Sequence, residues 1–352
     1  MKILFFSRLY NPHIGGVEKH VESLGLELSK KKHQVTIITE GYQPNLPSME
    51  AKHRIKIYRI PTHKTTEKDK KWLIWRWLWQ HINLLKSADI IHVHDVGYWW
   101  LPYRFVFPLK KVFMTFHGYE GTSSPTILAI VQRKISEWLS SGTIGVGDFM
   151  RTWYRAQPNL VSYGAVQSSQ LLKSPTQSNC QLFRAIYLGR LSQDIGIMTY
   201  LQALKILQKQ GVKIKLDVFG DGHQFIEAKQ FVKKNKLNVI FKGMVKNANQ
   251  YLPNYKLAFV SSYLAILEAM RAQVPVIAVF NNQIKQDYLT CHPQAKNMLI
   301  TNRPIVIAYN INQLIEKEKI NRAKLTLAYN WAKTQTWQNL TTQYLKLWQT
   351  KA

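Results

Sequence analysis

The sequence predicts an α/β protein built from two doubly wound parallel-sheet units in series. Three observations support this prediction. First, the chain has 352 residues, too many for one core and enough for two domains of roughly 150–180 residues. Second, short apolar runs alternate with longer amphipathic segments, as parallel strands alternate with crossover helices. Third, this pattern restarts after a polar stretch rich in Ser and Gln, which we interpret as an interdomain linker.

The apolar runs locate the expected strands. Those of the first unit are Ile3–Phe6, Val35–Ile38, Ile55–Tyr58, Ile90–Val93, Val112–Thr115 and Thr143–Val146. Those of the second unit are Arg184–Leu188, Lys215–Phe219, Val239–Lys242, Leu257–Val260 and Val276–Val279. The predicted boundaries are an N-terminal domain over 1–166, a linker over 167–179, a C-terminal domain over 180–336 and a polar-aromatic helix over 337–352. Ligands of such sheets bind at the carboxyl ends of the strands, so functional residues are expected there, in a cleft between the units.

The chain is strongly basic, with a formal net charge of +28. Both halves carry an excess of Lys and Arg, which indicates a basic face along the molecule rather than a basic tail. Such a field attracts polyanions, namely nucleic acid, an anionic membrane or a nucleotide-sugar. No nucleic-acid partner is expected, because no recognised binding module accompanies the charge. The alternative is a solvated basic surface with no partner.

Two cysteines, Cys180 and Cys291, are too few for a disulfide framework or a metal site and favour a reducing cytosol. No apolar run approaches the ~18–20 residues of a spanning helix, so any membrane contact is expected to be peripheral. We therefore expect a cytoplasmic protein, with peripheral attachment to the cytoplasmic face of a membrane as one option.

Residues 71–86 carry four tryptophans within one predicted helix. Trp72, Trp75 and Trp79 share one face of that helix, which Ile82 extends, and a lysine cluster lies around the start. The cluster consists of Lys64, Lys68, Lys70 and Lys71. Tryptophans beside lysines suit a helix in the interface of an anionic membrane, so contact through residues 64–86 is one interpretation. The other is that the tryptophans pack in the core.

Polar residues follow three strands of the first unit. Gly15 and Gly16 precede an amphipathic helix that contains Glu18, where paired glycines let the oxygens of a ligand approach backbone N–H groups. His92 and His94 share one face at the end of the fourth strand, followed by Asp95, and His117 ends the next strand. A metal site is the less favoured interpretation of these histidines, because no third ligand motif accompanies them. Polar contacts to a substrate are favoured instead.

The second unit repeats this arrangement. Arg190 follows the first strand, where a guanidinium can bind a diphosphate through two parallel hydrogen bonds. Gly220 and Gly222 form a turn after the second strand. Glu268 belongs to a predicted helix, where a carboxylate could accept hydrogen bonds from both hydroxyls of a ribose.

In this order, the residues resemble the motifs of glycosyltransferase family 4, the group 1 glycosyltransferases with the GT-B fold. The resemblance covers nearly the whole chain. Its motifs are Gly15-Gly16-Val17-Glu18, His92-Val93-His94, His117-Gly118, Gly189-Arg190-Leu191, Gly220-Asp221-Gly222, Glu268 and Pro275-Val276-Ile277-Ala278. Residues 238–243 resemble the segment that holds the nucleotide base, and the helix after Trp337 resembles the one that returns to the first domain.

The resemblance implies two Rossmann-like domains facing across a cleft, and transfer of a hexose-type sugar with retention of configuration. The nucleotide-sugar, UDP- or GDP-linked, would be a substrate and no cofactor or metal would be needed. His117 and Arg190 would be catalytic. The donor would contact Gly15, Gly16, Arg190, Gly220, Gly222, Lys242 and Glu268. His92, His94 and Glu18 would lie on the acceptor side, where a glycan or lipid-linked acceptor of cell-surface polysaccharide synthesis would bind.

Two positions depart from the family pattern. Ile195 stands where a lysine that neutralises the diphosphate is expected, and Val260 stands where the first carboxylate of the E-x7-E motif is expected. The E-G-F-G segment that contacts the sugar is missing between Tyr263 and Leu264. Two hypotheses follow from these losses. Either the chain is an active transferase in which neighbouring basic residues such as Lys242 or Lys285 substitute, or it is a degenerate GT-B protein that binds a glycan or a partner enzyme.

Overall fold

A computed structural model describes residues 1–119, 124–167, 183–316 and 318–350. The chain divides into two compact units. The first contains Met1–Gly121, Pro125–Ser162 and Trp337–Ala352, and the second contains Thr122–Ser124 and Tyr163–Thr336. Most of the predicted linker, together with Cys180, lies outside the described residues.

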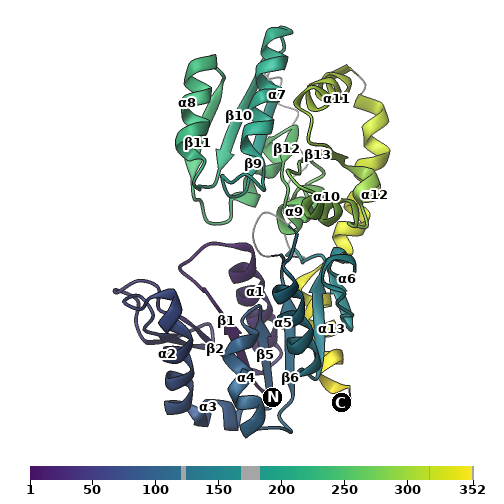
Figure 1. Cartoon of the computed structure of the whole chain (residues 1–352). Coiled ribbons are helices and arrows are strands. Elements are labelled where there is room, and N and C mark those ends of the chain that lie inside the picture. Colours follow the sequence, from purple (N-terminus) through teal and green to yellow (C-terminus); the bar gives the residue numbers. More distant parts are fainter. Residues whose placement is uncertain (120–123, 168–182, 317, 351–352) are drawn as a thin grey trace. The chain divides into compact units, whose positions relative to one another are not determined.

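The first unit is a sheet in the order β3-β4-β2-β1-β5-β6-β7-β8, parallel except for the pairing of β3 with β4. Its strands are β1 (Lys2–Ser7), β2 (Gln34–Glu40), β3 (Met49–Lys52), β4 (Ile55–Ile60), β5 (Ile90–His94), β6 (Val112–Phe116), β7 (Gly142–Val146) and β8 (Leu160–Ser162). Its helices are α1 (Gly16–Lys30), α2 (Glu67–Gln80), α3 (Ile82–Ser87), α4 (Gly97–Val106), α5 (Ile127–Trp138), α6 (Phe149–Tyr154) and α13 (Trp337–Gln349). Figure 1 shows α2, α4 and α5 on one face of this sheet, with α1 and α13 on the other. Helices on both faces bury the central strands, which explains their continuous apolar sequences.

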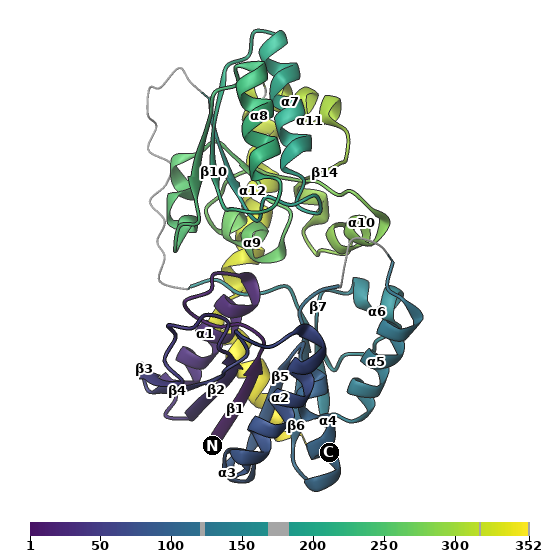
Figure 2. The same cartoon turned by 60° about the vertical axis from the view of Figure 1, so that its left-hand side comes forward.

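The second unit is a parallel sheet in the order β11-β10-β9-β12-β13-β14. Strands β9 to β13 are labelled in Figure 1, and β14 is labelled in Figure 2. Its strands are β9 (Phe183–Leu188), β10 (Ile214–Phe219), β11 (Val239–Gly243), β12 (Leu257–Phe259), β13 (Val276–Ala278) and β14 (Leu299–Ile300). Its helices are α7 (Ile197–Lys209), α8 (Phe225–Asn235), α9 (Tyr263–Arg271), α10 (Gln283–Thr290), α11 (Pro304–Glu316) and α12 (Glu318–Thr334), with 3₁₀ turns η1 (Ala248–Asn254) and η2 (Ala295–Asn297). Helix α7 packs against α8 and α11, whereas α9 packs against α12 and η1.

The predicted fold class, two doubly wound parallel sheets, is confirmed, and every predicted strand is present. The prediction missed β3, β8 and β14. These strands have only four, three and two residues, and the sequence of β3 is polar because this edge strand is largely exposed. Strands this short carry too little alternation to be recognised.

The helix predicted over residues 71–86 is wrong in its bounds. Helix α2 begins at Glu67 and ends at Gln80, and α3 starts again at Ile82. Ile82 therefore does not extend the tryptophan face of α2. The residues of α2 that enter the core are Ile74 and Leu78, which are one turn apart.

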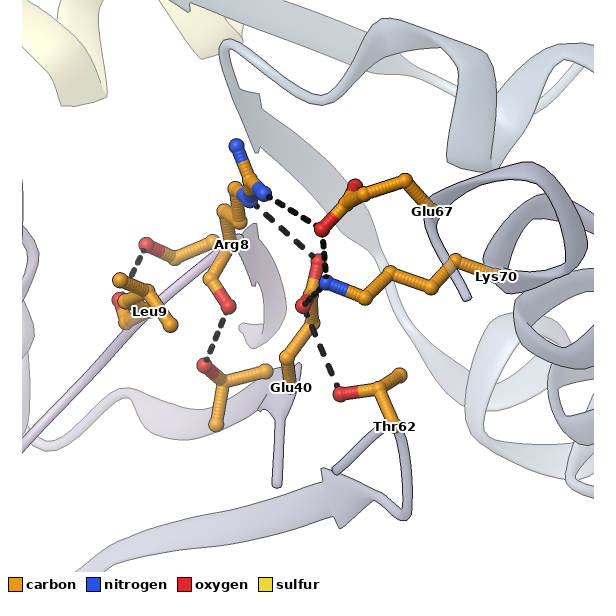
Figure 3. Close-up of polar contacts among 8 residues, drawn as sticks. Arg8, Leu9, Glu40, Thr62, Glu67 and Lys70 are labelled. Carbon is orange, nitrogen blue, oxygen red and sulfur yellow. Dashed lines mark hydrogen bonds and ion pairs between the residues drawn. The ribbon is translucent and has the colours of Figure 1, made fainter. Parts of the chain in front are cut away.

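A polar cluster at the carboxyl ends of β1, β2 and β4 holds the first turn of α2 (Figure 3). The carboxylate of Glu40, on β2, is buried and accepts hydrogen bonds from Lys70 at 3.2 Å and from Thr62 at 3.4 Å. Lys70 also donates to Glu67 at 2.6 Å, and Arg8 lies 3.6 Å from Glu40 and 3.5 Å from Glu67. A buried carboxylate needs such partners, so the cluster fixes where α2 leaves the sheet.

Helix α13 comes from the end of the chain and packs on α1 within the first unit. Its large side chains Trp337, Tyr344 and Trp348 are buried. Trp348 donates its indole N–H to Nδ1 of His92 at 3.0 Å, so the helix reaches the strand that carries the predicted histidines.

Candidate active site

Four histidines of the first unit gather near the ends of β5 and β6. His92 and His94 come from β5, His117 follows β6, and His20 comes from the buried face of α1. The rings of His20 and His117 are 4.8 Å apart, and those of His94 and His117 are 5.2 Å apart. His20 was missed by the sequence analysis, because only the orientation of α1 and the return of α13 bring it into this cluster. Its one sequence signal was its position four residues after Gly16 in an amphipathic helix.

All four histidines are neutral at physiological pH. Burial lowers the pKa of His20, His92 and His94 well below its usual value, and neighbouring histidines lower it further. Desolvation by burial lowers the pKa of His117 to about 3, although the residue as a whole is only half-buried. Neutral imidazoles can donate and accept hydrogen bonds but cannot act as proton donors in acid catalysis near pH 7.

His92 is completely buried, and both of its ring nitrogens are engaged. Nε2 lies 2.7 Å from the hydroxyl of Thr115, and Nδ1 accepts from Trp348. Both ring nitrogens of His92 are therefore occupied by the protein, and neither is available to a sugar acceptor. His92 is accordingly not assigned a contact with the sugar acceptor.

His94 and His117 form a direct pair. Nδ1 of His94 lies 2.9 Å from Nε2 of His117, so one nitrogen donates and the other accepts. The backbone N–H of His117 donates to the carboxylate of Asp95 at 2.8 Å. This contact fixes the loop after β6, so the partly exposed His117 is the member of the cluster best placed to meet a ligand. Within the described residues, no group of three or more His, Cys, Asp or Glu side chains has the arrangement of a metal site.

The start of α1 places Gly15, Gly16 and Glu18 together. Gly15 precedes the helix, and a side chain there would come within 2.2 Å of the Glu18 carboxylate. Glu18 pairs with His13 at 2.7 Å. Gly16 has open space where a side chain would project. The Glu18 carboxylate therefore lies at the positive end of the helix dipole. Because Gly16 has no side chain, the backbone N–H groups at the start of the helix are accessible to a ligand.

In the second unit, Arg190 lies on the loop after β9 with its side chain 74% exposed. Its guanidinium lies 3.3 Å from Asp194, whose other oxygen accepts from Ser192 at 2.5 Å. The carbonyl of Arg190 accepts from the hydroxyl of Tyr187 at 2.5 Å, which holds the backbone of the loop. The arginine is thus held at its backbone while its charge faces solvent.

Gly220 and Gly222 support this loop through the backbone. A Cβ on Gly220 would come within 1.9 Å of the carbonyl oxygen of Gly189, and one on Gly222 within 2.5 Å of that of Leu191. Between these approaches, the N–H of Leu191 donates to the carbonyl of Asp221 at 2.9 Å. The turn packs directly on the loop that carries Arg190, and only glycine permits this distance. Contact of the two glycines with a donor remains a prediction.

The side chains at the two positions that depart from the family pattern, Ile195 and Val260, are buried. Ile195 is 4% exposed and belongs to the core of the second unit, and Val260 is completely buried. Only three residues separate β12 from α9, so the expected sugar-binding loop has no room here. Glu268 is buried on α9, and Lys242 is exposed at the end of the edge strand β11.

An aromatic cluster surrounds this short connection, and the sequence analysis did not foresee it. Tyr263 and Tyr288 stack with centroids 3.8 Å apart, and the N–H of Tyr263 donates to the hydroxyl of Tyr288 at 2.8 Å. Tyr163 and His292 pack against Tyr263 at 5.1 and 5.4 Å. The first N–H of α9, which would otherwise be available to an anion, is therefore occupied by Tyr288.

Known proteins resemble the chain in both sequence and structure. The family model Glycosyltransferase Family 4 matches residues 14–159, and the model Glycosyl transferases group 1 matches residues 183–317. No curated protein matches the chain significantly. Among solved structures, sucrose-phosphate synthase from Thermosynechococcus elongatus has a TM-score of 0.79 at 17% identity, covering 99% of this chain and 98% of that one. A glycosyltransferase from Rickettsia africae has a TM-score of 0.73 at 13% identity, with coverages of 99% and 98%.

A third similar structure is WaaG, a glycosyltransferase involved in lipopolysaccharide biosynthesis, with a TM-score of 0.67 at 11% identity and coverages of 99% and 100%. The two parallel-sheet domains and these similarities define a GT-B glycosyltransferase fold. The chain belongs to the group 1 glycosyltransferases of the family 4-like kind, as the order of its motifs predicted.

Proposed function

We propose that the chain transfers a hexose-type sugar from a UDP- or GDP-linked donor to a glycan or lipid-linked acceptor, with retention of configuration. The observation that carries this proposal is the exposed guanidinium of Arg190 on a backbone-fixed loop at the carboxyl end of β9. Solved structures with the same fold include a starch synthase bound to ADP and acarbose and TarM in complex with UDP. Nucleoside diphosphates are therefore ligands of this architecture.

In the proposed reaction, the acceptor oxygen bonds to the anomeric carbon as the bond from that carbon to the diphosphate breaks. Arg190 stabilises the negative charge that develops on the leaving diphosphate, with no metal required. The acceptor proton passes to an oxygen of the leaving phosphate, because His117 is neutral with a pKa of about 3 and is paired to His94. His117 is assigned a hydrogen bond to the sugar, and Glu268 one to the ribose.

The donor site predicts a particular order of affinities. Because the sugar-contacting loop is absent, UDP or GDP should bind about as tightly as the corresponding nucleotide-sugar. Arg190→Ala should weaken both by roughly 1.5–3 kcal/mol, the contribution of a charge-assisted hydrogen bond. Isothermal titration of UDP, GDP and ADP and of their glucose conjugates measures this.

Arg322→Ala is the matched control, since Arg322 is an exposed arginine of α12 in the same unit. It should leave all affinities unchanged. A nucleotide-sugar that binds a hundredfold tighter than its diphosphate would show that another segment has rebuilt a sugar pocket. Failure of all three nucleotides to bind would contradict the proposed function itself.

We further propose that the first unit attaches peripherally to an anionic bilayer on its cytoplasmic face. No helix among the described residues is long and apolar enough to cross a bilayer. Trp72 and Trp79 are 63% and 59% exposed, so these two tryptophans are not core residues. Trp75 differs, because its indole donates to the carbonyl of Tyr98 at 2.8 Å and joins α2 to α4.

Neighbouring helices extend this apolar surface. Exposed apolar residues of α4, α5 and the turn after α4 are Leu101, Phe105, Val106, Leu109, Ile127, Leu128, Val131, Ile135 and Trp138. Lys64, Lys68 and Lys71 are exposed beside the tryptophans, whereas Lys70 is occupied by Glu40 and Glu67. Apolar side chains bordered by lysines fit the interface of an anionic membrane.

The double substitution Trp72→Ser and Trp79→Ser should release the protein from vesicles without unfolding it. Sedimentation with phosphatidylglycerol vesicles at low salt measures the bound fraction, and high salt should reduce it. Tyr309→Ser, which alters an exposed aromatic residue of α11 in the second unit, is the matched control and should bind like the wild type. Equal binding to neutral vesicles in high salt would contradict the proposed surface. So would a protein that self-associates in solution and does not sediment with vesicles.

A further inference from the structure

A lysine lies buried near the arginine of the proposed donor site. Lys285 is in the first turn of α10 and is only 3% exposed. Its backbone N–H donates to the side chain of Asn282 at 2.8 Å, and its ammonium lies 4.3 Å from the ring centroid of Tyr288. A buried ammonium group normally requires a carboxylate partner, because leaving water is costly for a charge.

The charge of Lys285 is not balanced by a partner of its own. Within the residues that the structure describes, no carboxylate forms an ion pair with this ammonium group. The nearby carboxylate, Asp194, is already paired with Arg190 and hydrogen-bonded to Ser192. Two cationic groups, Arg190 and Lys285, thus share the neighbourhood of one anionic group.

The charges of this group act on Lys285. Burial lowers the pKa of Lys285 from 10.5 to about 8, Asp194 opposes this shift and Arg190 adds to it. Both residues come from the loop after β9, and the aromatic ring beside the ammonium comes from Tyr288 on its own helix. An anion that enters here would stabilise the charged form of the lysine and remove an unfavourable excess of positive charge.

The aromatic cluster fixes the position of this lysine. Tyr288, one turn after Lys285, stacks on Tyr263 and accepts two hydrogen bonds from it, one at its hydroxyl and one at its backbone carbonyl. These contacts hold α10 against the start of α9. The stem of Lys285 therefore has little freedom, and its ammonium is held in place before any ligand binds.

We propose that Lys285 is a second diphosphate-binding cation, which replaces from α10 the lysine that is absent at Ile195. The ligand class is the diphosphate of a nucleoside diphosphate or nucleotide-sugar, so this assignment rests on the proposed function. The side chain at position 195 belongs to the core, and a cation is supplied by another element some ninety positions later in the chain. The proposal favours an active transferase over a degenerate scaffold.

The test is the pH dependence of UDP and GDP affinity between pH 7.5 and 9, a window above the titration of the phosphate near pH 6. In the wild type, affinity should fall by roughly tenfold across this window as Lys285 loses its proton. Lys285→Met should bind at least about tenfold more weakly at pH 7.5 and show no such slope. Lys285→Arg, which keeps the charge at all these pH values, should bind with a flat profile.

Arg190→Ala separates the two cations, since it should weaken binding but keep a pH slope, displaced to higher pH because Arg190 no longer lowers the pKa of Lys285. A thermal melt of each variant shows that it is folded. If Lys285→Met binds as the wild type does, or keeps the pH slope, Lys285 is not a ligand of the diphosphate. If the wild type binds neither UDP nor GDP at any pH, the proposed function fails first, and the two failures are distinguishable.

Discussion

Acidification from pH 7.5 to pH 5 is expected to destabilise the first unit by several kcal/mol. The pKa values of His20, His92, His94 and His117 are lowered in the folded protein. Below pH 6.5 the unfolded chain therefore binds protons that the folded chain does not, and stability is lost as the pH falls. Each such histidine contributes a loss of about 2 kcal/mol at pH 5, so the four together approach a typical total stability of 5–15 kcal/mol.

Guanidinium unfolding at pH 7.5, 6.5, 5.5 and 5 measures this loss, and hydrogen exchange assigns it to a unit. Peptides from α1 and α13 should lose protection first, because the second unit contains one comparable histidine, His292, whose pKa burial lowers to about 3. His20→Gln should remove about 2 kcal/mol of the loss between pH 7.5 and 5. His63→Gln, at an exposed histidine, should remove none. A stability that stays constant down to pH 5.5 would contradict neutral, buried histidines.

The fold could be predicted from the sequence because parallel strands buried on both faces are continuous apolar runs. That signal is strong in β1 and β5, whose side chains are almost all buried. It fails for β14, which has two half-buried residues and owes its existence to pairing with β13. Such an edge is defined by tertiary contacts, which a local pattern does not contain.

The tryptophan segment shows the same limit in a helix. Periodicity placed Trp72 and Trp79 on one face of α2 but did not decide which face is buried. Ile74 and Leu78 form the core-facing pair, and the ion pairs of Lys70 with Glu40 and Glu67 help to orient the helix. Glu40 lies on a different strand, so the orientation depends on a contact between distant parts of the chain.

The candidate site was partly predictable for a similar reason. The motif order located Arg190 and His117, because each follows a strand of its own sheet, β9 or β6. Ligands of such sheets bind at the carboxyl ends of the strands. The same motif comparison found that Ile195 replaces a lysine. It suggested Lys242 or Lys285 as substitutes but could not decide between them, because the position of Lys285 depends on how Tyr288 stacks on Tyr263.

Gly220→Ala is expected to destabilise the second unit by about 2–5 kcal/mol and to abolish nucleotide binding. The added methyl group would lie 1.9 Å from the carbonyl oxygen of Gly189, and φ at this position is +143°. Both the overlap with backbone and the strained φ contribute, at roughly 1–3 and 1–2 kcal/mol. The loop that carries Arg190 would have to move to relieve the overlap.

Gly211→Ala separates the two contributions. Gly211 has φ +80° but no heavy atom near the position of an added methyl group, so this substitution introduces backbone strain alone. We expect it to cost about 1–2 kcal/mol and to leave nucleotide affinity unchanged. Guanidinium unfolding and UDP or GDP titration of both variants measure the difference. If Gly220→Ala costs no more than Gly211→Ala and still binds nucleotide, the close approach of the glycine turn does not hold the arginine loop. If Gly220→Ala costs more stability than Gly211→Ala and also loses nucleotide binding, Gly220 and Gly222 act on the donor site through the backbone of residues 189–191. No direct contact between these glycines and the nucleotide is then needed to explain their place in the motif.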